Sequence, residues 1–354
     1  MTEIPKVSRL RHDDAPVTEG HIQNLFSRIR DRKDERSGVI DVYDVIDRLQ
    51  LDVVTEVFLG ESAYSLKAEE HPFRDAMERL LQVNTIRLPF GRLAKLAPDW
   101  LIAPKSYIVL SRYIDGLIAK TLAHPMNQGE EWKDLNLVED IVAQRPGDRM
   151  FIRGQLVAVL MAAKRPGLIK QLQDEIRTHI GIDVIPEPKD LTKLTLLEKV
   201  LKETQRMYHP LGLNVREARI DTTLPVGGGP HGSLPVSIPK GQLLLYSVDG
   251  LQKNESIVGA NATEWDPSRW DTWDPKEGEY IPFSLGPRSC PGKIFGLFQM
   301  RFTLVRILQE YESISWAGYG NGDKEEDAQP MPIMLELNCK PAKRVLCQFV
   351  PRVK

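Results

Sequence analysis

One cysteine of this chain lies in a segment whose residue types could support metal chemistry. Cys290 follows Pro287 and Arg288 and precedes Gly292, and the residues after it have the apolar spacing of a helix. Glycines and prolines on both sides force a tight loop, and backbone N–H groups at a helix start favour a thiolate over a thiol. Two interpretations follow from these residues: an inert buried thiol, the usual role of a single cysteine, or an axial thiolate ligand to haem iron.

This segment resembles the haem-binding loop of the cytochrome P450 superfamily, Phe-x-x-Gly-x-Arg-x-Cys-x-Gly. All five fixed positions are present, at Phe283, Gly286, Arg288, Cys290 and Gly292. The resemblance implies that Cys290 is the thiolate ligand of the iron of haem b, that Arg288 contacts a haem propionate, and that Phe283 packs against the ligand loop. Gly286 and Gly292 belong to the same cofactor-binding set.

A glutamate and an arginine are spaced one helical turn apart, at Glu203 and Arg206. On a solvated helix such a pair is worth only a few tenths of a kcal/mol, whereas a buried pair needs further partners to offset desolvation. The P450 superfamily has a Glu-x-x-Arg helix upstream of its cysteine, and its third partner is an arginine in a segment that resembles residues 265–270. The resemblance implies that Glu203, Arg206 and Arg269 form a structural triad that does no bond chemistry.

The segment after this helix contains a triple glycine at residues 227–229. A phosphate loop is rejected because the Gly-Lys-Ser/Thr ending is absent. Residues 211–230 resemble the strand and turn at the same place in fungal P450 enzymes of the alkane and fatty-acid hydroxylase branch. The resemblance implies that Arg216 reaches a haem propionate and that Leu211, Leu213 and Val215 face the substrate.

The resemblance is interrupted at the distal helix of the family. Phe151–Ala163 resembles the first half of that helix, which in the family continues with Gly-x-Asp/Glu-Thr-Thr. Here Ala163 is followed directly by Lys164, Arg165 and Pro166. The acid and the threonine that deliver protons during oxygen activation are missing, so no catalytic residue is assigned. A gene-model artefact and a real change of function both remain open. The family's N-terminal anchor, proline-rich hinge and first sheet are also expected to be absent.

The elements that must position these residues are mainly helices. Apolar spacing predicts helices over residues 40–59, 151–163, from Pro166 onward, 191–208 and after Cys290. After Pro210 the prolines and glycines increase, and strands are predicted at 234–238, 242–248, 332–339 and 344–350, the last two as a hairpin. The fold class is therefore mostly α (α+β), and the resemblance implies a truncated cytochrome P450 fold. We expect one haem-binding domain over residues 1–354, helix-rich over 1–210 and mixed with β-structure over 211–354.

Composition excludes several other classes of protein. The chain of 354 residues has a formal net charge of -2, which argues against a dedicated nucleic-acid-binding protein. Three cysteines exclude a disulfide scaffold, and no stretch approaches the ~18 apolar residues of a membrane helix. No pair of histidines has the helical spacing of metal ligands.

The resemblance implies a haem-thiolate monooxygenase that inserts one oxygen atom into a C–H bond of an apolar substrate, either a secondary metabolite or a fatty acid or alkane. Electrons would come from NADPH through a flavin-containing NADPH-cytochrome P450 reductase, with Lys293, Arg301 and Arg306 as docking candidates. The family is usually bound to the endoplasmic-reticulum membrane and faces the cytoplasm, but we expect no span in this chain. Two alternatives stay open: a degenerate haem protein, and a haem-dependent isomerase or dehydratase.

Overall fold

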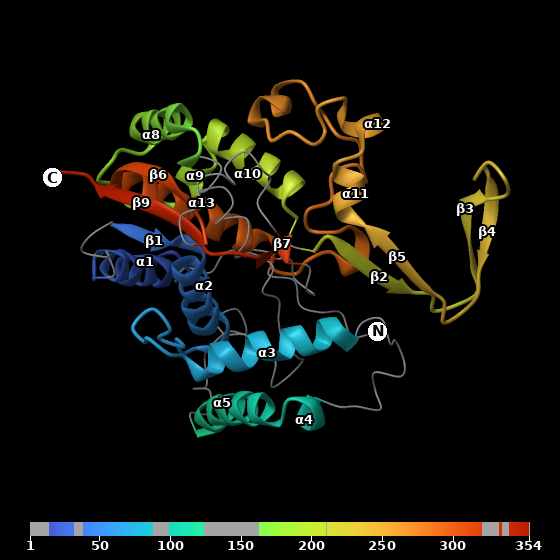
Figure 1. Cartoon of the computed structure of the whole chain (residues 1–354), viewed down its shortest axis with the longest axis horizontal. Helices are drawn as coiled ribbons and strands as arrows, with labels where there is room; N and C mark the ends of the chain where they lie inside the picture. Colours follow the sequence, from blue (N-terminus) through green and yellow to red (C-terminus); the bar gives the residue numbers. More distant parts are fainter. Residues whose placement is uncertain are drawn as a thin grey trace, which may run out of the picture.

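The computed structural model describes residues 14–31, 38–87, 99–123, 163–209, 211–320, 333–334 and 340–353. Helices fill most of the first part, and short strands alternate with helices after residue 210 (Figure 1). The helices are α1 Asp14–Asp31, α2 Val42–Leu59, α3 Pro72–Arg87, α4 Asp99–Ile102, α5 Pro104–Ala123, α8 Pro166–His179, α9 Pro188–Leu191, α10 Thr195–Met207, α11 Val248–Gln252, α12 Glu255–Val258 and α13 Lys293–Glu310, with 3-10 turns η2 Pro267–Asp271 and η3 Gly286–Arg288.

Four small antiparallel sheets accompany these helices. Their strands are β1 Val39–Asp41, β2 Leu213–Glu217, β3 Thr222–Gly228, β4 Leu234–Ile238, β5 Leu243–Ser247, β6 Tyr311–Tyr319, β7 Ile333–Met334, β8 Lys340–Pro341 and β9 Val345–Pro351. The pairs are β2 with β5, β3 with β4 and β7 with β8, and β9 lies between β1 and β6. The β3–β4 hairpin extends away from the body of the molecule (Figure 1). The mostly α (α+β) fold class is confirmed.

The pairing at the end of the chain differs from the sequence expectation. A hairpin between residues 332–339 and 344–350 was expected, but β9 pairs with β1 and β6, which lie far from it in the sequence. The short strand β7 pairs instead with β8, where Ile333 lies opposite Pro341. The expectation was wrong because β9 is apolar apart from Gln348, so its sequence does not single out one partner, and packing against β1 and β6 decides the pairing.

Helix α2 shows how local sequence sets the element boundaries. Asp41 is its N-cap, because the carboxylate accepts a hydrogen bond from the backbone N–H of Tyr43. Gly60 ends the helix in the left-handed conformation, with φ 78°, and its N–H bonds the carbonyl of Glu56. The predicted start at residue 40 is two residues early because residues 39–41 form β1.

The core centres on α13, the helix that follows Cys290. Nearly every residue from Phe295 to Gln309 is buried, and α13 packs against α8, α10, α1 and β6. A helix that is buried on nearly all sides is typical of a central element of the core. Because α13 begins three residues after Cys290, the packing of α13 also fixes the position of the cysteine. Among the described residues, no helix combines the length and apolar character needed to cross a bilayer.

Candidate functional site

The segment from Phe283 to Cys290 forms a closed loop. The N–H of Cys290 donates to the carbonyl of Phe283 at 2.8 Å, and the N–H of Ser289 donates to Gly286 at 3.0 Å. Gly286 has φ 72°, in the left-handed region where a side chain is strained. Ser284 has φ 59°, a rare value for a residue other than glycine. These two positions give the loop its sharp curvature and return the chain to Phe283.

This loop holds Cys290 close to the N-terminus of α13. Its residue exposure is 7%, and that of Phe283 is 8%, so both side chains are buried against the core. The first turn of α13 begins with a hydrogen bond from the N–H of Gly296 to the carbonyl of Gly292. The sequence expectation of a cysteine on a tight loop before a helix therefore matches the structure. The side chain of Arg288 lies outside the described residues, so its expected contact stays a prediction.

Arg216 lies beside the loop, as the sequence suggested. Its Nη2 donates to Oγ of Ser284 at 3.0 Å, and its Nη1 donates to Oδ1 of Asn214 at 2.9 Å. The hydroxyl of Tyr246 lies 3.4 Å from the same Ser284 oxygen, and the guanidinium lies 5.5 Å from the Tyr246 ring centroid. One cation and two hydroxyl groups from β2, β5 and the loop thus meet at one place. Such a cluster can bind a carboxylate.

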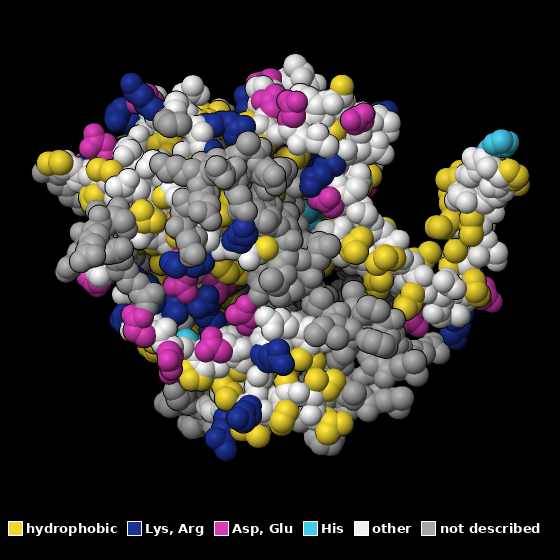
Figure 2. Space-filling model, in the orientation of Figure 1, with side chains coloured by type: hydrophobic (Ala, Val, Ile, Leu, Met, Phe, Trp, Pro, Cys, Tyr) yellow, Lys and Arg dark blue, Asp and Glu magenta, His cyan; other side chains and the backbone are white. Residues whose placement is uncertain are grey.

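The predicted substrate residues on β2 lie on the opposite face of the strand from Arg216. Leu213 and Val215 are 49% and 39% exposed, and they alternate with Asn214 and Arg216. Leu245 on β5 pairs with Val215 and is 63% exposed. Hydrophobic side chains gather over this two-stranded ladder (Figure 2). Leu211 precedes the strand and is half-buried. An apolar surface of this kind is typical of a binding face.

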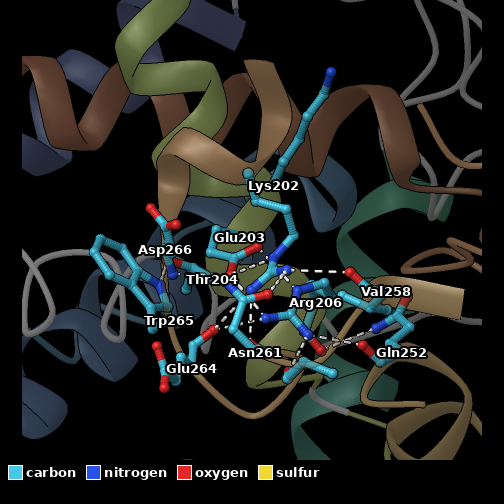
Figure 3. Close-up of polar contacts among 12 residues, drawn as sticks. Lys202, Glu203, Thr204, Arg206, Gln252, Val258, Asn261, Glu264, Trp265 and Asp266 are labelled. Atoms are coloured by element: carbon cyan, nitrogen blue, oxygen red, sulfur yellow. Dashed lines mark hydrogen bonds and ion pairs between the residues drawn. The ribbon is translucent and has the colours of Figure 1, made fainter. Parts of the chain in front are cut away.

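Glu203, Arg206 and Arg269 meet in the core. Figure 3 shows Glu203 and Arg206 at the centre of this network. Arg206 binds Glu203 through two parallel hydrogen bonds of 2.9 and 2.7 Å, and both side chains are 0% exposed. Arg269 Nε lies 3.4 Å from Glu203 Oε1. The sequence interpretation had placed these residues together, and the structure brings them together.

Further groups complete this network, and the sequence interpretation had not identified them. Backbone carbonyls of Gln252, Ala262 and Glu264 accept hydrogen bonds from Arg206 at 2.8, 2.6 and 2.9 Å. Arg269 donates to Oδ1 of Asn261 at 2.6 Å, and Trp270 Nε1 donates to Glu203 at 3.1 Å. A charge-assisted network with this many partners offsets the desolvation of its ions. Trp270 directly follows Arg269 and could have been found from the sequence, whereas the loop carbonyls could not.

The structure describes the chain only after the point where the expected distal helix ends, from Ala163 onward. Residues 151–162 lie outside the described residues, so the expected helix there stays a prediction. Ala163 is helical and 3% exposed, Lys164 lies in a turn, and α8 begins at Pro166. Lys164 Nζ lies 4.6 Å from the ring centroid of Trp316, and the Arg165 guanidinium lies 4.5 Å from that of Trp265. Cation–π contacts therefore anchor the chain directly after Ala163.

Two of the three basic residues expected to dock a reductase are engaged within the molecule. Arg306 is 9% exposed and binds Glu19 at 2.8 Å, so the expectation that it lies on a solvated docking face is wrong. Arg301 forms an ion pair of 2.6 Å with Glu198. Lys293 is exposed, and its Nζ lies 6.0 Å from the ring centroid of Phe283 in the cysteine loop. These three side chains lie where they do because α13 is buried on nearly all sides, which leaves few of its residues exposed.

No cluster of three or more histidine, cysteine or acidic side chains with metal-binding geometry occurs in the described part of the chain. Of the other two cysteines, Cys347 is buried in β9, and burial together with the nearby Asp41 raises its pKa to about 12. Such a thiol stays protonated at neutral pH. Cys339 lies outside the described residues.

Comparison with known proteins agrees with this geometry. The family model described as "Cytochrome P450" matches residues 156–335. The chain is 30% identical to Cytochrome P450 52E1 of Candida apicola, over 78% of this chain and 60% of that protein. It is 31% identical to Cytochrome P450 monooxygenase alt2 of Alternaria solani, over 88% and 66%, and 28% identical to Cytochrome P450 monooxygenase pvhE of Talaromyces variabilis, over 88% and 64%. The chain thus spans less than two thirds of the length of these relatives.

Proposed function

Because this chain belongs to the cytochrome P450 family, we propose that it is a haem-thiolate monooxygenase that inserts one oxygen atom into a C–H bond of an apolar substrate. The observation that carries the proposal is the buried Cys290 on a closed loop at the start of α13. Family membership implies a haem cofactor. We propose that NADPH, through a flavin-containing reductase, supplies the electrons and that the exposed Lys293 contacts that reductase.

The described residues fit a haem. A haem needs an axial donor and a cation for its propionates, and Cys290 and Arg216, which contacts Ser284 of the cysteine loop, fit these two needs. Cys290 is the candidate ligand because a closed loop holds it buried directly before α13. The bound haem would supply the oxidising chemistry.

The roles of the protein residues follow from their positions. Cys290 would hold the iron as a thiolate, and the loop hydrogen bond to Phe283 would fix the sulfur in place. Arg216, with Ser284 and Tyr246, would orient a propionate. Leu211, Leu213 and Val215 are proposed to hold an apolar substrate, either a fatty acid or alkane or a secondary metabolite. Leu213 and Val215 lie on the face opposite Arg216, so this assignment requires the substrate to pass along the edge of β2.

The shortened distal segment predicts poor coupling of electron use to product. As a helix, residues 151–163 would span only about 20 Å, and the non-helical backbone of Arg165 directly before Pro166 separates this segment from α8. The acid and threonine that would position a proton are absent, and positioned proton transfer is worth roughly 10²–10⁴-fold. In turnover with a matched reductase we expect most NADPH to yield peroxide rather than product.

Two insertion variants test whether the shortened distal helix causes this uncoupling. Inserting the missing half-helix of a relative between Ala163 and Lys164 should raise product per NADPH, whereas inserting the same length of alanines should not. Measuring product and peroxide per NADPH for all three chains decides the matter. Tight coupling by the unmodified chain would show that another proton source is present. Bound haem with neither product nor NADPH oxidation would argue against monooxygenase activity.

A further inference from the structure

A buried histidine connects the cysteine loop to the strand that carries Arg216. His209 is 5% exposed and lies between α10 and β2. Its Nε2 is 2.8 Å from the carbonyl oxygen of Pro282, and its Nδ1 is 3.1 Å from the backbone nitrogen and 2.7 Å from the carbonyl oxygen of Leu211. We propose that His209 is a positioning residue that holds the Cys290 loop in the geometry of a thiolate ligand. This inference rests on the proposed haem-thiolate function.

The chemistry of the two neighbours determines where the ring proton lies. The carbonyl oxygen of Pro282 can only accept, so a hydrogen bond at 2.8 Å requires a proton on Nε2 of His209. Nδ1 then accepts from the N–H of Leu211 in the neutral ring, or donates to the Leu211 carbonyl in the protonated ring. The contact with Pro282 is present in both states. The link from His209 to the loop is therefore independent of the charge of the ring.

The contact at Pro282 reaches the cysteine through one backbone step. Pro282 is followed by Phe283, whose carbonyl accepts the N–H of Cys290 at 2.8 Å. On the other side, the N–H of Ile281 donates to Oε1 of Gln252, which is fully buried. The Ile281–Phe283 segment is thus held by two buried side chains, and the backbone of Cys290 is held by that segment.

His209 also places the loop relative to the proposed binding face. Leu211, the other partner of the ring, leads directly into β2, where Arg216 contacts Ser284 of the same loop. The strand and the loop are therefore joined at two points, through His209 at Pro282 and through Arg216 at Ser284. Loss of His209 removes the contact at Pro282 and leaves the segment held by Gln252 at Ile281 and by Arg216 at Ser284. We expect the loop to open more often and Cys290 to lose its fixed position.

Two substitutions distinguish the roles of the two ring nitrogens of His209. His209→Asn keeps a polar atom near Leu211 but cannot reach Pro282, whereas His209→Gln places an amide N–H near Pro282. His21→Gln is the matched control, because His21 is also a 5% exposed histidine and its Nε2 lies 2.7 Å from Oε2 of Glu56 on α2. In the haem-loaded ferrous chain with carbon monoxide, we expect the red-shifted Soret band of thiolate ligation to fall strongly in His209→Asn, to recover in His209→Gln, and to persist in His21→Gln.

A second measurement does not depend on haem. In the cofactor-free full chain, alkylation of Cys290, followed by mass spectrometry of its peptide, should be about two- to tenfold faster in His209→Asn, as expected for one lost hydrogen bond. Equal alkylation and equal bands in His209→Asn and His21→Gln would overturn the proposal. If the unmodified chain binds haem without a red-shifted band, the proposed function fails, and the alkylation rates still decide the role of His209.

A third measurement needs no variant and covers the case in which His209→Asn does not fold. Nitrogen-15 chemical shifts of the histidine rings in the unmodified full chain report which nitrogen of His209 carries the proton. A proton on Nε2 supports the bond to Pro282. A ring protonated only on Nδ1 would contradict it, because Nε2 could then not donate to the Pro282 carbonyl.

Discussion

Replacing Cys290 with alanine should abolish the red-shifted Soret band of the ferrous carbon monoxide complex. The band reports a thiolate bound to the iron, and Cys290 is the cysteine that a closed loop holds at the start of α13. The side chain is small and the loop is closed by backbone hydrogen bonds, so we expect the variant to fold. Bound haem should fall as well, since an axial bond is lost. The measurement is the reduced carbon monoxide difference spectrum, normalised to haem content.

The chain contains its own controls for this experiment. Cys347→Ala removes the thiol of β9. Burial raises the pKa of Cys347 to about 12, so this thiol does not form a thiolate at neutral pH, and the Soret band should persist in the variant. Cys339→Ala should also leave the band unchanged. A band that survives in Cys290→Ala but disappears in either control would move the ligand to another cysteine and would remove the main support for the proposed function.

The helices that carry the site could be predicted because their sequences are periodic on their own. The predicted helix from Pro166 and the one ending near Tyr208 correspond to α8 and α10, and the predicted strand 234–238 is β4. Each of these segments encodes its own period and its own Pro or Gly boundary. The loop around Cys290 could be predicted for the same reason, because its glycines and prolines are adjacent in sequence.

The parts that could not be predicted depend on contacts between distant residues. Strand β6 was missed, although Ile314 and Trp316 alternate with serines, and its pairing with β9 brings Ile314 opposite Phe349. His209 gives no sequence signal, because a single histidine before a proline is common in loops. Its role emerges only when Pro282, more than seventy residues later, lies beside its ring. The buried position of Arg306 likewise depends on Glu19 of α1.

Replacing Glu203 with glutamine should cost about 3–5 kcal/mol of folding free energy, because Arg206 would be left as a buried cation without its anion. Both side chains are 0% exposed, so water cannot replace the lost charge. A typical domain has only ~5–15 kcal/mol of stability. We therefore expect a large drop in the urea midpoint of the full chain and little haem-loaded protein on expression. Arg269→Ala should act in the same direction, since Arg269 binds Glu203 and Asn261.

Glu198 on the same helix provides the matched control for this prediction. Its carboxylate also pairs with an arginine, Arg301, at 2.6 Å, but both side chains are partly exposed. Exposed ion pairs are worth about 0–1 kcal/mol, so Glu198→Gln should shift the urea midpoint little. The contrast between the two glutamates tests the buried network as a whole, because residue type, helix and the arginine partner are the same while burial and the further partners of Glu203 differ. Equal midpoints for the two variants would show that the buried network does not stabilise the fold. Normal folding and haem content with altered turnover in Glu203→Gln would instead assign the network a direct part in the reaction.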